Sequence, residues 1–328
     1  MSLARFLLKR GLQGVFVVWG VVTVVFLLRF ITPGDPISVI APLDASPATR
    51  QAIAAELGLN RPLYVQYLDY LVGLLQGDMG YSYISNTSAS ARVFARLPAT
   101  LELAVAATLV AVVLSIPLGV LSATNRNEPV DYGATTFSLV GISTPNFWLG
   151  IMLVLLFAVE FGVFKTSGRG ITSARALSAL ATGNLDVFVS WLTYITLPAI
   201  TLGTYFTALI TRLTRSGMLD ELGSAYVRAT RAKGLPETLV RYRHALRNTL
   251  IPVVTVLGLQ LGTLIGGAVI TEAVFAWPGL GTLVINSITG RDWVVLQGSL
   301  IVIGVGFVLI NLVVDALYAY LDPRVVSD

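Results

Sequence analysis

The stretch LAVAATLVAVVLSIPLGVLSATN, residues 103–125, contains no charged side chain. A helix needs about 20 mostly apolar residues to cross the hydrocarbon core of a bilayer, and this stretch is long enough. The rest of the chain has the same character, with 328 residues, a mean hydropathy of +0.78 and only 12% charged residues. Soluble domains carry about 25% charged residues. A chain this long and this apolar predicts an all-α membrane protein with the lipid bilayer as its solvent.

Five other stretches of 18 or more residues are equally free of Asp, Glu, Lys and Arg. Lipid cannot satisfy exposed backbone polar groups, so runs of this length favour helices. The first run is longer than the roughly 7–15 apolar residues of a signal peptide, and we interpret it as an uncleaved helix. We therefore expect six transmembrane helices, at residues 11–28, 103–125, 132–159, 187–211, 248–271 and 293–314.

Lysine and arginine residues near the ends of the spans indicate orientation. If the N-terminus is cytoplasmic, 13 of them lie on the inner side and 4 in the short outer loops, those 4 being Lys165, Arg169, Arg175 and Arg291. The sequence thus predicts a multi-pass protein of the cell (inner) membrane with both termini in the cytoplasm. The net charge of +4 follows from this orientation, and we expect no nucleic acid as a partner.

The six spans divide the chain into a tail and first helix at 1–31, an extracytoplasmic loop at 32–99 and a five-helix core at 100–328. In the outer loop, Ser46-Pro47 predicts a helix start and Gly58 a helix stop. A second helix should begin near Pro62, with its apolar residues on one face. That face could cap the bundle, or it could serve as a gate or a dock for a soluble partner that delivers substrate.

The cytoplasmic loop 212–247 predicts a helix, a glycine turn and a second helix. Asp220 and Glu221 would lie in the first turn of a helix that runs to Lys233, because the macrodipole favours acids there. Gly234 would end it, and Pro236 would open the next helix. Orientation and binding of anionic lipid explain the basic charge of the loop. They do not explain two helices around a glycine, a shape that another protein can grip.

This loop resembles the signature loop of ABC importer permeases. That pattern is Glu-Ala-Ala, three residues, Gly, nine residues, Ile, one residue, Leu-Pro. With its glycine aligned on Gly234, the positions Ala229, Gly234 and Leu246 match. The chain departs from the pattern in the way that is usual in the dipeptide, oligopeptide and nickel group of these permeases, at Arg228, Thr230, His244 and Arg247.

Further blocks along nearly the whole chain are similar to the same group. They are Pro33-Gly34-Asp35-Pro36, Leu57-Gly58-Leu59, Tyr64-x-x-Tyr67, Gly77-Asp78-x-Gly80, Leu97-Pro98-Ala99-Thr100-Leu101, Pro145-x-Phe147-Trp148-Leu149-Gly150, Glu272-x-x-Phe275-x-x-Pro278-Gly279-x-Gly281 and Leu321-Asp322-Pro323-Arg324. The resemblance implies a type I importer fold in which two permeases, usually non-identical, form one pathway. It also implies two separate ATPase subunits and an external binding protein that delivers the cargo, short peptides or nickel.

The chain contains no G-x-x-x-x-G-K-[ST] phosphate loop, so the ATPase must be another chain. We therefore expect a transport subunit that is not an enzyme and has no cofactor of its own, with ATP and magnesium on the partners. The resemblance implies that Gly234 makes a sharp turn and Ala229 a close contact with the ATPase. The full set implied for coupling is Arg228, Ala229, Thr230, Arg231, Lys233, Gly234, His244, Leu246 and Arg247.

The fifth span carries small residues at helical spacing, which allow close approach of another helix. The stripe and the polar residues beside it are Thr255, Gly258, Gln260, Gly262, Thr263 and Gly266. Two interpretations stay open. The stripe packs against another helix of this chain, or it forms the seam with the second permease and the wall of the pathway.

Acidic residues lie only near the ends of the spans. Glu102, Glu160 and Glu272 should be solvated at the outer interface, and Asp315 should be capped or paired near the inner one. The prolines Pro117, Pro145 and Pro198 should kink their helices. The alternative to an ABC permease is an ion-driven secondary transporter or a channel without an ATPase. A proton relay would need acids near the middle of the membrane, where we find none.

Overall fold

The computed structural model describes residues 3–31, 37, 41 and 44–321. The sequence blocks at 33–36 and 322–324 lie outside these residues. The first half contains α1 (Leu3–Ile31), α3 (Pro47–Glu56), α4 (Leu63–Leu75), β1 (Tyr81–Ser82), β2 (Thr87–Ser88), α5 (Ala89–Thr124), α6 (Pro129–Ser143), α7 (Asn146–Leu153) and η1 (Val154–Glu160). The second half contains α8 (Ser173–Ala181), α9 (Leu185–Leu222), α10 (Ala225–Ala232), α11 (Glu237–Leu239), η2 (Val240–Ala245), α12 (Leu246–Gly267), α13 (Val269–Val274), α14 (Leu280–Thr289) and α15 (Trp293–Leu321), where η marks a π-helical segment.

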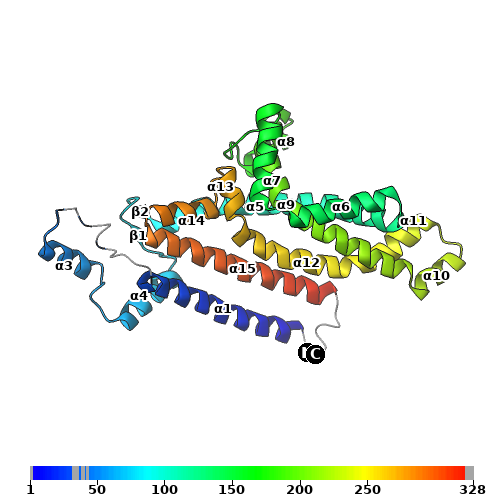
Figure 1. Ribbon diagram of the computed structural model, residues 1–328. Coiled ribbons are helices and arrows are strands. Elements are labelled where there is room, and N and C mark those ends of the chain that lie inside the picture. Colours follow the sequence, from blue (N-terminus) through cyan, green and yellow to red (C-terminus); the bar gives the residue numbers. More distant parts are fainter. Residues whose placement is uncertain (1–2, 32–36, 38–40, 42–43, 322–328) are drawn as a thin grey trace.

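The long helices α1, α5, α12 and α15 run side by side and form the body of the molecule (Figure 1). Five helices in the described part of the chain are long and apolar enough to cross a membrane, and the count becomes six if a bent pair of helices is taken as one span. The outer loop with α3 and α4 lies at one end of this bundle, and α10 and α11 lie at the other (Figure 1). The fold is that of a polytopic α-helical membrane protein, as the apolar runs predict.

The helices α5 and α9 form the centre of the bundle because small residues let their backbones meet. A Cβ atom on Gly203 would lie 2.7 Å from the carbonyl oxygen of Ala107, and one on Gly119 would lie 2.5 Å from Thr214. Alanines at positions 99, 104, 107 and 111 of α5 are buried in the same core. Close approach of small residues is the usual way in which helices pack in lipid, where no hydrophobic effect drives them together.

The two predicted outer helices are present. The hydroxyl of Ser46 caps α3 by accepting a hydrogen bond from the amide of Thr49, and Gly58 has a φ of +67° after its last turn. Helix α4 lies across the outer end of α1, where the hydroxyls of Tyr67 and Thr23 are 2.6 Å apart and Phe26 contacts both Tyr67 and Tyr70. One face of α4 therefore packs on the bundle.

The third predicted span is not one straight helix. The chain bends by 109° between α6 and the helix formed by α7 and η1. The cause is Pro145, since a proline disfavours the helical conformation at the residue before it. Thr144 accordingly has an extended ψ of 124°. Pro117 and Pro198, by contrast, lie inside the continuous helices α5 and α9.

Candidate functional site

The first helix of the cytoplasmic loop begins later than Asp220, where the acidic residues Asp220 and Glu221 predict its start. Helix α9 continues to Leu222, so Asp220 and Glu221 lie in its last turn and not in the first turn of a new helix. Packing overrides the dipole preference here, because Met218 is fully buried against Val120 and Ala245 and extends α9 beyond the apolar run. The next helix, α10, begins after Ser224, whose backbone is extended.

Helix α10 is anchored on one side only. Val227 is fully buried and faces the rest of the loop, while Val240 is fully buried on the η2 side. The backbone of α10 lies against α9 and η2. The opposite face presents Arg228, Ala229 and Lys233 to solvent. We call these three residues, with Arg231 and Gly234, the exposed face of α10.

Gly234 makes the turn between the two helices. Its φ is +76°, a conformation that L side chains rarely adopt. Its amide donates to the carbonyl of Arg231 at 2.9 Å, which closes the last turn of α10. A Cβ atom at Gly234 would meet nothing within 4 Å. The glycine is therefore required for its backbone conformation and not for lack of space.

A salt-bridge network braces this turn. The guanidinium of Arg231 donates two hydrogen bonds to the carboxylate of Glu237, at 2.8 and 3.1 Å, and Arg241 donates to the same carboxylate at 3.2 Å. The hydrogen bond with Glu237 raises the pKa of Arg231 above its usual value. Glu237 is the single acid among the basic residues from 228 to 247, but the sequence does not show that it faces both arginines.

A second network joins α10 to the helices on both sides. The hydroxyl of Tyr226 donates to the carboxylate of Glu221 in α9, and Asn248 in α12 donates to that hydroxyl at 3.0 Å. Burial and then the bond to Glu221 raise the pKa of Tyr226, so its hydroxyl stays protonated. The carbonyl of His244 lies 3.4 Å from the same hydroxyl. Tyr226 thus fastens α10 to two spans.

The other predicted coupling residues take different positions. Thr230 is half-buried and turns its hydroxyl to the carbonyl of Val227. Leu246 packs with the buried cluster around Met218. Arg247 is exposed beside it in the first turn of α12. Because η2 continues into α12 without a break, Leu246 and Arg247 belong to the base of the loop and not to the exposed face of α10.

An ion pair between a buried carboxylate and a half-buried guanidinium lies at the inner end of the bundle, below the loop. The carboxylate of Asp131 in α6 accepts two hydrogen bonds from Arg215 in α9, at 2.6 and 2.8 Å. It also accepts from the hydroxyl of Ser122 in α5 and the amide of Asn127. One carboxylate therefore ties together the inner ends of three helices. No sequence pattern pointed to this contact.

The glycine stripe of α12 meets α15 of the same chain. A Cβ atom on Gly258 would lie 2.2 Å from Val314, and one on Gly262 would lie 3.1 Å from Asn311. The nearest contact of Gly266 is looser, at 3.9 Å from Ile303. The polar residues of the set are less covered, with Thr255 and Gln260 half-buried and Thr263 exposed.

Two of the acids expected to be solvated are buried at the outer end. Glu272 is fully buried, and its carboxylate accepts from the hydroxyl of Thr100 at 2.7 Å and the amide of Thr282 at 3.0 Å. The indole of Trp277 donates to the carbonyl of Ala99 at 2.8 Å. The sequence motif around Glu272 therefore contacts the motif around Thr100. These contacts join α13 and α14 to α5.

The remaining edge acids divide between pairs and solvent. Glu102 is buried and accepts hydrogen bonds from Arg169 and from the indole of Trp191, contrary to its expected solvation. Glu160 is exposed, as expected. Asp315 pairs with Arg10 at 3.4 Å. Among the described residues, no three His, Asp or Glu side chains come close enough to hold a metal ion.

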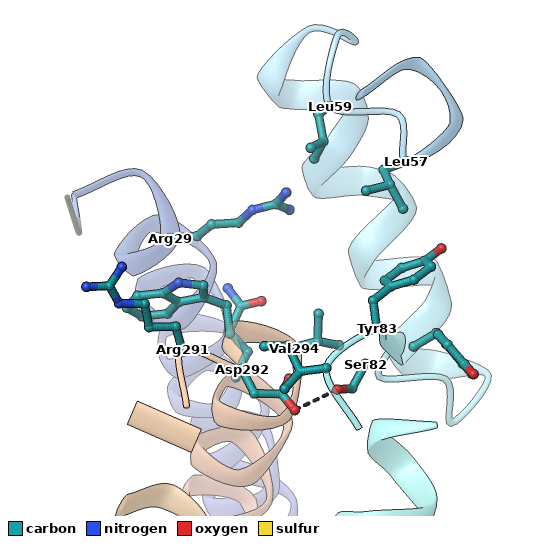
Figure 2. Close-up of a pocket in the computed structure, with 12 residues that line it drawn as sticks. Arg29, Leu57, Leu59, Ser82, Tyr83, Arg291, Asp292 and Val294 are labelled. Carbon is teal, nitrogen blue, oxygen red and sulfur yellow. Dashed lines mark hydrogen bonds between the residues drawn. The ribbon is translucent and has the colours of Figure 1, made fainter. Parts of the chain in front are cut away.

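A pocket opens at the outer end between α1, the β1–β2 hairpin and the start of α15 (Figure 2). Asp292 lies at its floor and accepts a hydrogen bond from the hydroxyl of Ser82 at 2.6 Å. Arg92 pairs with the same carboxylate at 3.3 Å. Figure 2 shows Arg29 extending toward the segment that carries Leu57 and Leu59. The pocket thus has a polar floor and an arginine on one wall.

Comparison with known proteins places these features in a family. Residues 115–327 match the family described as "Binding-protein-dependent transport system inner membrane component", and residues 3–104 match the N-terminal family that accompanies it. The chain is 40% identical over 318 residues to the dipeptide transport system permease protein DppB of Escherichia coli (strain K12), with 93% of this chain and 94% of that protein covered. It is 39% identical over 324 residues to the oligopeptide transport system permease protein AppB of Bacillus subtilis (strain 168), at 98% and 99% coverage.

A solved structure shares the fold. A chain of the MetNI methionine ABC transporter, in an inward-facing conformation, superposes with a TM-score of 0.53 at 18% identity. The match covers 70% of this chain and 96% of that chain. At this level of identity the likeness shows the fold alone.

Proposed function

The chain belongs to the family of binding-protein-dependent transport system inner membrane components, and from this premise we propose how it works as the permease subunit of an ATP-driven peptide importer. The exposed face of α10 sits in a groove on an ATPase subunit. A second permease forms the other half of the pathway, and an extracytoplasmic binding protein delivers the cargo. The relatives are permeases of peptide transport systems, which supports this function over an ion-driven transporter or a channel.

The observation that carries the proposal is the rigid attachment of α10. Tyr226 ties it to Glu221 in α9 and Asn248 in α12, and the turn at Gly234 is braced by Arg231 and Glu237. A displacement of α10 by the ATPase must therefore move two spans. A ligand needs about 5.5 kcal/mol of differential affinity to move a two-state population from 1:99 to 99:1. ATP-driven closure of two ATPase subunits would supply this difference and switch the bundle between inward-facing and outward-facing states.

We assign short peptides as the cargo, because the relatives named above carry dipeptides and oligopeptides. Gln260 and Thr263 offer amide and hydroxyl groups on the side of α12 that faces away from the glycine stripe against α15. Such groups can bond the amides of a peptide without holding it tightly. The outer pocket at Asp292 lies on the side from which a binding protein would approach.

The proposal predicts a difference between two substitutions of Gly234. Valine disfavours a φ of +76°, at a cost of about 1–3 kcal/mol, whereas asparagine tolerates this conformation. Gly234→Val, like Gly234→Pro, should insert into the membrane normally but lose the ATPase subunits when the complex is purified in mild detergent, and should lose peptide uptake in proteoliposomes. Gly234→Asn should keep most of both.

Gly234→Asn is the matched control for Gly234→Val, because a Cβ atom at Gly234, which both variants share, meets nothing within 4 Å. Any difference between the two variants therefore reports on the backbone turn. Normal uptake by Gly234→Val would overturn the coupling role of the loop. If the unsubstituted chain purifies without ATPase subunits, under conditions that preserve a known importer complex, the importer function itself is wrong.

A further inference from the structure

A second pocket, with a volume of about 290 Å³, opens at the inner end of the bundle between α5, α6 and α9. The salt bridge between Asp131 and Arg215 lies beside it, in the first turn of α6. The charged turn with Arg126 and Glu128 directly precedes that helix. The part of α6 that lines the pocket, residues 134–142, begins about 7.5 Å from its first residue at 1.5 Å per residue. The pocket therefore runs from the charged inner surface into the apolar layer.

The pocket combines an unbalanced positive charge with an apolar wall. Two arginines of α9 line it, and Arg215 already donates to Asp131 at 2.6 and 2.8 Å. Arg212 is exposed and forms no ion pair with a carboxylate in the described part of the chain. Leu139 and Ile142 line the end of the pocket that lies farther along α6. One guanidinium thus faces the pocket without a counter-charge from these residues.

We propose that this pocket binds an anionic phospholipid of the inner leaflet. A phosphate oxygen accepts hydrogen bonds from Arg212, and part of an acyl chain lies along Leu139 and Ile142. Arginine suits this role because its planar guanidinium can bond two phosphate oxygens at once. Basic pockets between transmembrane helices on the cytoplasmic side bind anionic headgroups in the same way. The assignment uses the orientation of the chain in the membrane and does not depend on the proposed ATPase or cargo.

The size of the pocket favours a lipid over a helix of another subunit. One turn of a helix is 5.4 Å long and at least about 10 Å wide with its side chains, so it occupies about 400 Å³ or more. This exceeds the 290 Å³ of the pocket. A single acyl chain is much narrower than a helix and can enter. A free phosphate would use Arg212 alone and would leave the apolar wall empty.

Native mass spectrometry of the full-length chain in mild detergent tests the proposal. The protein is titrated with phosphatidylglycerol and, separately, with phosphatidylcholine, which has the same phosphate but no net charge. Phosphatidylglycerol should bind more tightly. Arg212→Gln should weaken its binding about tenfold, the effect of 1.4 kcal/mol. Arg126→Gln is the matched control and should leave the affinity unchanged, because Arg126 is exposed at the same end and does not line the pocket.

A second substitution separates a lipid from a free phosphate. Thr135→Trp fills the pocket from its exposed edge and keeps Arg212, so it should weaken phosphatidylglycerol as much as Arg212→Gln does. The site is not a lipid site if Thr135→Trp binds phosphatidylglycerol normally and inorganic phosphate displaces the lipid. Equal affinities of Arg212→Gln and Arg126→Gln would also overturn the assignment. So would a complex with its partner subunits in which Arg212→Gln has no effect, because another subunit then covers the pocket.

Discussion

Glu272 occupies a space that two glycines leave for it. A Cβ atom on Gly279 would lie 2.1 Å from a carboxylate oxygen of Glu272, and one on Gly281 would lie 3.0 Å from the other. The amide of Thr282 and the hydroxyl of Thr100 then reach the carboxylate directly. At the residue scale, the Pro-Gly-x-Gly block is thus a cradle that allows a buried acid to join α13 and α14 to α5.

We predict that Gly279→Ala destabilises the protein, because the new methyl group must displace the Glu272 carboxylate from its donors. Overpacking of this kind costs about 1–3 kcal/mol. The melting temperature of the purified protein should fall. Gly133→Ala is the matched control, since a Cβ atom at Gly133 in α6 meets nothing within 4 Å. Equal melting temperatures for the two variants would show that the cradle is looser than the structure indicates.

The burial of Glu102 and Glu272 could not be predicted from the residues near them in the sequence. Glu102 and Glu272 were expected at a solvated edge because each follows or precedes an apolar run. Their partners are far away in the chain, with Thr100 lying 172 residues from Glu272 and Arg169 lying 67 residues from Glu102. Only the packing of helices brings them together. Asp315 was expected to be capped or paired, and the structure pairs it with Arg10 of α1.

At the scale of elements, the ion pair between Asp131 and Arg215 connects helix α6 to helix α9. Asp131→Ala should destabilise the protein by about 3–5 kcal/mol, because it leaves a partly buried guanidinium without its carboxylate. The second substitution Arg215→Met should restore part of the loss. Thermal unfolding of the three proteins measures both effects.

The control for this pair is Arg61→Ala, which breaks the pair with Asp69 at the outer surface. Both of its side chains are 61% exposed, and exposed pairs contribute about 0–1 kcal/mol. If Asp131→Ala unfolds at the same temperature as Arg61→Ala, the pair at the inner end of the bundle does not connect the helices as described.

Element positions were predictable where a local signal marks them. Ser46 with Pro47 and the turn at Gly234 lie where the sequence puts a helix start and a helix stop. The bend at Pro145 was predicted only as a kink, because a proline signal does not carry an angle. The end of α9 was also misplaced. Nothing local shows that Met218 packs on Ala245 and carries the helix past Thr211 to Leu222.

At the scale of the whole molecule, the two ends of the bundle differ in structure. The loop with α10 lies at one end, and the pocket at Asp292 lies at the other (Figure 1, Figure 2). The number of spans is predicted from the apolar runs, and their direction from the distribution of lysine and arginine. Both signals come from many residues, so a wrong interpretation of one residue does not change either prediction. The contacts between subunits leave no such summed signal, since an apolar stripe looks alike in sequence whether lipid or protein covers it.

The orientation of the chain in the membrane gives a last prediction. Because the sequence contains no cysteine, single introduced thiols can test it. Tyr83→Cys places one thiol on the exposed β1–β2 turn, and Glu128→Cys places one on the exposed turn between α5 and α6. A membrane-impermeant maleimide should label the first variant in right-side-out membrane vesicles and the second only in inside-out vesicles. The unsubstituted chain carries no thiol and gives the background. The reverse pattern would put α10 outside the cell, away from any ATP, and the charge-based orientation and the coupling role would both be wrong.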